Sequence, residues 1–194
     1  MPQLNCIIDI SHHQSITDFS ALNSAGITHI IHKATQGFSI VDKKYITRKI
    51  RWRDEMGLPW GSYHFLGKKA RGDHQAEFYL NTINDVMPNE LTCLDYEHDN
   101  GVLPNFEIVE SFIEYFEKAA NDKQLVIYVN NSIYNNFKTR LSQYPIWIAR
   151  YSKRPDFNTY KLWQYTENGE LPGISICDRD YFNGTEEELN NFWK

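Results

Sequence analysis

Residues 91–97 read LTCLDYE, a short apolar run that ends in two acids separated by one residue. Its composition is typical of a buried β-strand. Because side chains alternate along a strand, Asp95 and Glu97 lie on one face, about 7 Å apart. Two other strand-like segments carry acids at comparable positions, namely Asp9 in residues 6–11 and Asp178 with Asp180 in residues 175–182. Functional groups of parallel α/β folds gather at the carboxyl ends of the strands, so we expect these acids to meet in one cavity.

Strand-like and helix-like segments alternate along the chain. The strand candidates are residues 6–11, 29–35, 60–66, 91–97, 124–130, 146–151, 161–166 and 175–182. The helix candidates are residues 17–25, 42–56, 73–84, 106–120 and 131–141. The alternation predicts parallel βαβ units, followed by closure with β-strands alone. We therefore expect a barrel-like α/β domain that is too short for eight complete βα units. An open doubly wound sheet is the rival, but no GxGxxG follows the first strand.

Composition excludes several classes of protein. The chain has 194 residues, with 20 Lys plus Arg against 25 Asp plus Glu and a formal net charge of −5. This balance argues against nucleic-acid binding, and no apolar run is long enough to span a membrane. The N-terminal residues show no secretory signal. Cys6, Cys93 and Cys177 are odd in number and lie in strand candidates, so we expect buried free thiols. No CxxC or HExxH spacing supports a structural zinc site.

Several carboxyl groups that converge on one cavity repel each other, so at least one should hold a proton near neutral pH. A protonated carboxyl beside an ionised one is what cleavage of a glycosidic bond requires. Aromatic residues, which make up 14% of the chain, are suited to stacking on sugar rings.

Six motifs, in order along the chain, resemble those of glycoside hydrolase family 25, the Chalaropsis-type lysozymes or N-acetylmuramidases. DISHHQ at residues 9–14 resembles DxSxxQ, and HKATQG at residues 32–37 is similar to KATEG. The others are GSYHF at residues 61–65, LDYE at 94–97, IWIARY at 146–151, and WQY at 163–165 with Gly173 and Asp178.

This resemblance implies a flattened, irregular TIM-like barrel of about five β/α units closed by three β-strands, with residues 1–194 forming a single catalytic domain and no separate wall-binding domain. It implies hydrolysis of the β-1,4 bond between N-acetylmuramic acid and N-acetylglucosamine in peptidoglycan, without a cofactor or metal. Glu97 would be the general acid and Asp95 would stabilise a neighbouring group, with Asp9 and Asp178 completing the acidic site. The substrate's own N-acetyl oxygen would act as nucleophile, with net retention. Sugar-binding residues are expected to be Tyr63, Tyr128, Trp147, Tyr151, Gln164 and Asp180.

Three residues depart from the family pattern. Gln36 stands where Glu is usual, which removes one acid and is expected to change substrate binding or the pH profile. Asp180 stands where Asn is frequent, which adds an acid beside Asp178. Arg150 occupies a variable position and is expected to contact an acidic group of the substrate.

Two alternatives remain open on sequence alone. The acids, with His12, His13, His64 or His98, would suit a metal-dependent phosphodiesterase on a TIM-like barrel. A non-catalytic peptidoglycan-binding module is the second alternative. We expect a protein made in the cytoplasm that acts on the cell wall after release or non-Sec export. The acidic charge suggests a delivery or export partner, and a phage endolysin, an exported toxin and a recycling enzyme all fit.

Overall fold

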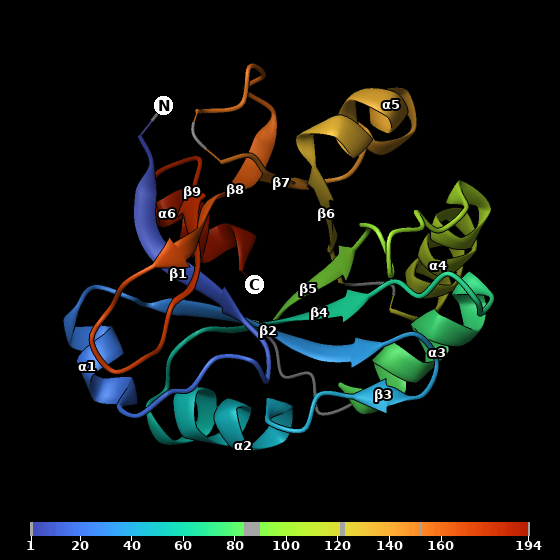
Figure 1. Ribbon diagram of the computed structural model, residues 1–194. Coiled ribbons are helices and arrows are strands. Elements are labelled where there is room, and N and C mark those ends of the chain that lie inside the picture. The colour runs from blue at the N-terminus through green and yellow to red at the C-terminus, as the bar shows by residue number, and fades with distance from the viewer. Residues whose placement is uncertain (1, 84–89, 121–122, 152, 194) are drawn as a thin grey trace.

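The computed structural model describes residues 2–83, 90–120, 123–151 and 153–193 (Figure 1). The strands are β1 (Leu4–Ile10), β2 (His29–Gln36), β3 (Ile40–Val41), β4 (Trp60–Phe65), β5 (Glu90–Asp95), β6 (Leu125–Asn130), β7 (Ile146–Ala149), β8 (Tyr160–Gly169) and β9 (Cys177–Phe182). The helices are α1 (Phe19–Ser24), α2 (Tyr45–Lys49), its π-helical continuation η1 (Ile50–Glu55), α3 (Gly72–Thr82), α4 (Phe106–Ala119), α5 (Asn131–Leu141) and α6 (Glu186–Phe192).

Within the described residues, eight strands close a barrel in the order β1-β9-β8-β7-β6-β5-β4-β2, because β1 also pairs with β2. The pairing is parallel between β1 and β2 and between each further pair of neighbours along β2-β4-β5-β6-β7-β8. Strand β9 is antiparallel to both of its neighbours, β8 and β1. Five β/α units precede β7, β8 and β9, which complete the barrel with no helix between them in the part of the chain that the structure describes. The predicted fold, a TIM-like barrel of five units closed by three strands, is confirmed.

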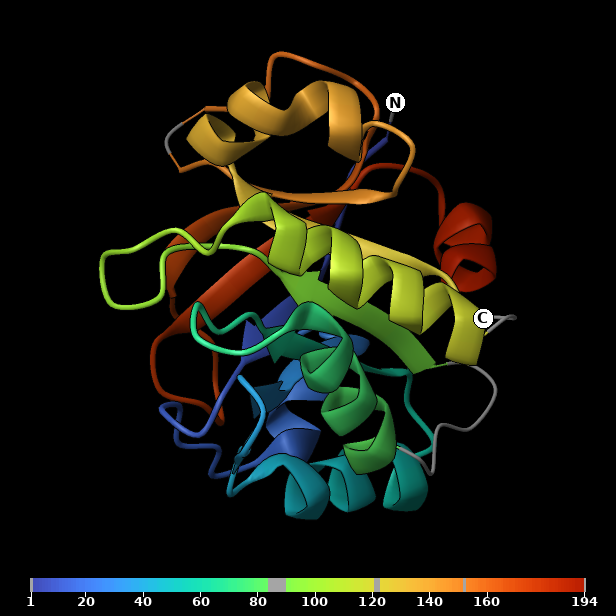
Figure 2. The same ribbon diagram turned by 90° about the vertical axis from the view of Figure 1, so that its right-hand side faces the viewer.

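Alternation along each strand sorts the apolar side chains into two cores. Ile7 and Ile31 point into the barrel, where they pack with Leu91, Val126, Trp147 and Leu162. Their neighbours Ile8 and Ile30 point outward to the layer beneath the helices, with Phe112 and Phe116 of α4. Near-continuous apolar strands are expected in such a barrel, because both faces of each strand are covered. Figure 2 shows α3 and α4 lying over β4 and β5.

The contact between α3 and α4 depends on a glycine at the first residue of α3. A Cβ atom built on Gly72 would lie 1.9 Å from the carbonyl oxygen of Ile108 and 2.5 Å from the backbone nitrogen of Phe112. The absence of a side chain therefore allows the two helices to pack with their backbones in contact.

Helix α6 closes the amino end of the barrel and was not among the predicted helices. Thr185 accepts from the backbone of Glu188, whose carboxylate accepts from Thr185 N, a capping box that fixes the start of α6. After α6, Trp193 donates from Nε1 to the carbonyl of Trp60 at 2.9 Å and packs edge-on against His29. Trp60 and His29 are the first residues of β4 and β2, so Trp193 covers the amino end of the barrel, opposite the end where the acids lie.

Some predicted boundaries differ from the structure. The helix predicted for residues 42–56 begins at Tyr45, because Asp42 instead accepts hydrogen bonds from the backbone nitrogens of Lys44 and His12. It ends before Gly57, which adopts a positive φ of 67° as its sequence predicts. Residue 84, the predicted end of α3, lies outside the described residues.

Candidate active site

The carboxyl ends of the parallel strands surround a cavity of about 220 Å³. Because β9 runs antiparallel, its first residues reach the same end of the barrel, and Asp178 is the register partner of Asp9 on β1. Asp95 is the last residue of β5, and Glu97 follows two positions later. The cavity is lined by Asp9, Tyr63, Asp95, Glu97, Tyr128, Trp147, Tyr151, Gln164, Glu167 and Asp178. Nine of the ten residues expected at the site thus lie together.

Gln164 of β8 connects the acids to the aromatic wall. Its Nε2 donates to Oδ2 of Asp9 at 2.8 Å. Its Oε1 accepts from the hydroxyl groups of Tyr128 at 2.9 Å and Tyr151 at 3.0 Å. Because the NH₂ group of Gln164 points to Asp9, its carbonyl oxygen faces the two tyrosines. Both hydroxyl groups must therefore donate to that oxygen, which fixes their orientation at the cavity.

Asp180 is the tenth expected residue, and it lies behind the cavity wall. Its side chain is fully buried, and Trp147 Nε1 donates to its Oδ1 at 2.7 Å. Asp180 therefore contacts the back of a residue that lines the cavity instead of lining it.

Burial dominates the electrostatics of the acids. It raises the pKa of Asp95 well above the usual range, and the charge of Glu97 raises it further. One oxygen of Asp95, Oδ1, is buried without a hydrogen-bond partner. Burial also raises the pKa of Asp178 to about 6, with Glu167 and Glu97 adding to the effect. The cavity therefore favours protonated carboxyl groups at mildly acidic pH.

Glu97 combines partial exposure with a perturbed pKa. Burial raises the pKa of Glu97, whereas Lys33 and His98 lower it. Lys33 extends from β2, donates from Nζ to Oε1 of Gln36 at 2.7 Å and lies 4.6 Å from the centre of the Phe65 ring. Since Gln36 is neutral, the charge of Lys33 is not cancelled there and acts on the acids of β5.

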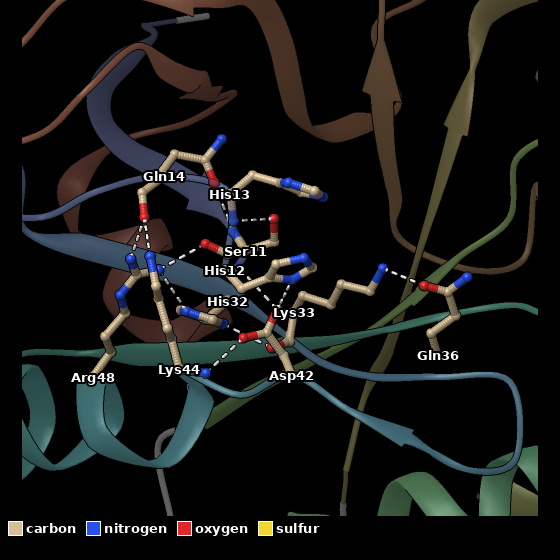
Figure 3. Close-up of polar contacts among 10 residues, drawn as sticks. All are labelled: Ser11, His12, His13, Gln14, His32, Lys33, Gln36, Asp42, Lys44 and Arg48. Carbon is tan, nitrogen blue, oxygen red and sulfur yellow. Dashed lines mark hydrogen bonds and ion pairs between the residues drawn. The ribbon is translucent and has the colours of Figure 1, made fainter.

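The loop that follows β1 is held by a polar network (Figure 3). Gln14 Oε1 accepts from the backbone nitrogen of Ser11 at 2.8 Å, which closes the turn. Arg48 of α2 donates to the carbonyl of Ser11 at 2.7 Å. Asp42 Oδ2 lies 2.8 Å from both the backbone nitrogen and Nδ1 of His12. The spacing of Ser11 and Gln14 thus has a structural reason: it fixes the backbone just beyond Asp9.

His64 also has a structural role in this conformation. It is fully buried, with Nδ1 lying 2.7 Å from the Thr35 hydroxyl and Nε2 lying 3.1 Å from Oε1 of Gln75. Both ring nitrogens are therefore occupied within the protein.

Glu167 lines the cavity and was not predicted. It lies three residues after Gln164, and the register between β8 and β9 shifts between Gln164 and Thr166. This irregularity breaks the two-residue alternation. Simple strand periodicity consequently could not assign Glu167 to the cavity.

Comparison with known proteins agrees with this architecture. The family model described as glycosyl hydrolases family 25 matches residues 8–174. An uncharacterised protein of Escherichia coli O157:H7, YegX, is 31% identical, with 95% of this chain and 72% of that protein covered. Lysozyme M1 of Streptomyces globisporus is 27% identical, with 94% and 69% covered. A solved family GH25 lysozyme from Aspergillus fumigatus superposes with a TM-score of 0.83 at 25% identity, and both chains are covered completely. The family model covers most of the chain, including Asp9, Asp95 and Glu97, and the chain therefore belongs to glycosyl hydrolase family 25.

Proposed function

We propose that this protein is a lysozyme that hydrolyses the β-1,4 bond between N-acetylmuramic acid and N-acetylglucosamine in peptidoglycan, with Glu97 as the general acid. The observation that carries the proposal is the position of Glu97, in a cavity lined by Asp9, Asp95 and Asp178. Membership of the family and the similarity to lysozymes support the activity and its substrate.

Glu97 is suited to donate the proton for three reasons. It is only partly buried, so its carboxyl is accessible from the cavity. Burial raises its pKa, which increases the protonated fraction at mildly acidic pH. Asp95 two residues earlier on the same face completes the pair of carboxyl groups that glycosidases use.

The mechanism we propose is substrate-assisted. Glu97 transfers its proton to the bridging oxygen while the carbonyl oxygen of the substrate's N-acetyl group attacks the anomeric carbon. The glycosidic bond breaks, and an oxazolinium ion forms on the substrate. Asp95 stabilises the positive charge that develops on the amide nitrogen. Water then opens the ring on the same face, with Glu97 accepting its proton, so that the configuration is retained.

Aromatic side chains and Gln164 form the remainder of the cavity. Tyr63, Tyr128 and Trp147 line the cavity, but Tyr128 and Trp147 are almost fully buried, whereas Tyr151 stands at the more exposed side and is the better placed to stack on a sugar ring. The ring centres of Tyr128 and Trp147 lie 4.7 Å apart, and this contact keeps the wall of the cavity fixed.

Digestion of purified peptidoglycan, with mass analysis of the new reducing ends, tests the proposal. We expect terminal N-acetylmuramic acid, released equally in the presence of a chelator. Terminal N-acetylglucosamine contradicts the assigned bond. Activity lost in chelator would favour the metal-dependent phosphodiesterase, and binding of the wall without new reducing ends would favour the non-catalytic module.

A further inference from the structure

Lys33 places a half-buried ammonium group at the edge of the cavity. Its register partner on β4 is Tyr63, which lines the cavity. Its Nζ donates to Oε1 of Gln36 at 2.7 Å and lies 4.6 Å from the centre of the Phe65 ring. Lys33 takes part in none of the ion pairs among the described residues. Since buried lysines are usually paired with an acid, the neutral Gln36 is an unusual partner.

An irregularity in β2 brings Gln36 to Lys33. The register between β2 and β4 shifts between Lys33 and Thr35. Ala34 and Thr35 both face the outer layer, where Ala34 belongs to the core beneath the helices and the Thr35 hydroxyl lies 2.7 Å from Nδ1 of His64. Lys33 and Gln36, although three residues apart, therefore share the inner face of the strand. Figure 3 shows the side chain of Lys33 reaching Gln36.

Phe65 connects the position of this ammonium group to the acids of β5. The register partner of Phe65 is Gln36 on β2 and Asp95 on β5. Neighbouring strands lie about 4.8 Å apart, so a charge held over the Phe65 ring is one strand away from Asp95. Glu97 follows two residues later and lines the same cavity, and we call these two residues the acid pair of β5. Burial raises the pKa of both acids, whereas the charge of Lys33 lowers the pKa of both.

We propose that Gln36, being neutral, leaves the charge of Lys33 available to the acid pair of β5, so that position 36 sets the pH range in which the protein cleaves peptidoglycan. Gln36 acts through Lys33 and is therefore a positioning residue that needs no contact with the substrate. A carboxylate at position 36 would form an ion pair with Lys33 and cancel its charge, and both acids would then ionise at higher pH. The inference rests on the proposed function of the acid pair.

The other titratable groups around the acid pair and Lys33 remain unchanged when position 36 is substituted. Around the acid pair they are Asp9 of β1, Tyr63 of β4, His98 of the loop after β5, Tyr128 of β6, Tyr151, Glu167 of β8 and Asp178 of β9, and around Lys33 they are His13, Asp42, His64 and Asp99. Asp42 and Asp99 accept from backbone nitrogens of other residues, so both carboxylates are engaged elsewhere. A comparison of variants at position 36 therefore isolates the effect of Lys33.

The pH profile of kcat/KM tests the proposal, because it reports the ionisation of the free enzyme. We expect Gln36→Glu to move both limbs of the profile to higher pH by roughly 0.5–1 pH unit, the effect of one unit charge at ~10 Å in a partly solvated site. Gln143→Glu is the matched control, since it makes the same chemical change at an exposed residue after α5. Limbs that coincide with those of the wild type, that move to lower pH, or that move equally in Gln143→Glu would overturn the proposal.

Substitution of Lys33 separates its charge from its packing. Lys33→Met keeps an unbranched side chain and removes the charge, so both limbs should again move to higher pH. Lys33→Arg keeps the charge and should show limbs close to those of the wild type. A purely structural role would lower kcat in both variants without moving the limbs. Limbs of Lys33→Met that match the wild type contradict the proposal, even if Gln36→Glu does not fold.

Carbon NMR decides the question without any activity. In protein labelled at the carboxyl carbons of aspartate and glutamate, Asp95→Asn and Glu97→Gln assign the two resonances. We expect the acid pair to titrate at higher pH in Gln36→Glu than in the wild type, and identical titrations would contradict the proposal. If the wild type cleaves no peptidoglycan, the proposed function fails, while these titrations still decide whether Lys33 acts on the acid pair. Circular dichroism establishes that each variant folds.

Discussion

Glu97→Gln replaces the proposed proton donor with a side chain of almost the same size that has no transferable proton. General acid catalysis contributes about 10²–10⁴-fold to the rate, which corresponds to about 3–5 kcal/mol in the activation barrier. We expect the loss of kcat to lie in the upper half of that range. The neighbouring carboxyl is poorly placed to replace Glu97, because Asp95 is only 6% exposed and is proposed to serve the amide of the substrate.

The same substitution should leave the fold as stable as before, or more so. Burial is the main cause of the raised pKa values of Asp95 and of Asp178, the latter about 6, and the charge of Glu97 adds to both, after that of Glu167 for Asp178. A carboxyl group whose pKa is higher in the folded than in the unfolded protein favours the folded state most strongly below its unfolded-state pKa of about 3.9. That contribution to the free energy of unfolding is lost as the pH rises through the folded-state pKa. At pH 7 the ionised acids therefore repel each other in the folded protein. Removing the charge of Glu97 relieves part of that repulsion, so Tm should rise at pH 7, with a smaller difference at about pH 4.

Release of reducing ends from peptidoglycan gives kcat, and differential scanning calorimetry gives Tm for the same preparations. Glu77→Gln on α3 is a matched control, because it removes one exposed carboxylate far from the acids. More than about a tenth of wild-type activity in Glu97→Gln would refute its role as general acid. A clear fall in Tm at pH 7, with activity lost, would instead indicate a structural role.

Asp95→Asn should lose most activity, because a neutral amide cannot offset the charge that develops on the substrate, and a thiazoline mimic of the oxazoline should inhibit the wild type. Proton NMR of fresh product should detect the β-anomer first, and an initial α-anomer would eliminate the substrate-assisted route. The thiols of Cys93 and Cys177 should react slowly with thiol reagents until the protein unfolds, because burial raises the pKa of both; rapid labelling of native protein with loss of lysis would contradict this. Gly72→Ala should lower the free energy of unfolding by about 3 kcal/mol, since its Cβ would overlap the backbone of α4, and denaturant unfolding within experimental error of wild type would show that the helices separate at little cost.

The alternation of residue types along the sequence predicted much of the fold and many residues of the cavity. Asp95 and Glu97 were expected on one face because they lie two apart at the end of an apolar run, and both line the cavity. The predicted free thiols are also present, with Cys93 and Cys177 buried and Cys6 partly buried. These features depend on local periodicity, which a sequence displays directly.

Features that depend on departures from periodicity were not predicted. Glu167 follows a register shift in β8, and the π-helical turn of η1 leaves no distinct pattern in the sequence. The capping box at Thr185 was available as a signal for α6, but the helix is short. Asp180 follows the alternation of β9, yet whether such a residue faces the cavity or lies behind it depends on the neighbouring strand, where Trp147 covers it. The assignment of residues 1–194 to one catalytic domain and the route to the cell wall stay predictions.

The closure of the barrel by β9 has a consequence for the timing of biosynthesis. Asp9 lies on β1, but Gln164, which holds it, is 155 residues further along the chain, and Asp178 on β9 follows later still. A chain whose synthesis has passed β5 but not β9 thus contains the proposed acid pair without the opposite wall of the cavity. The cavity is completed only when β9 has been synthesised and has paired with β1, so that a chain interrupted before β9 lacks an assembled site.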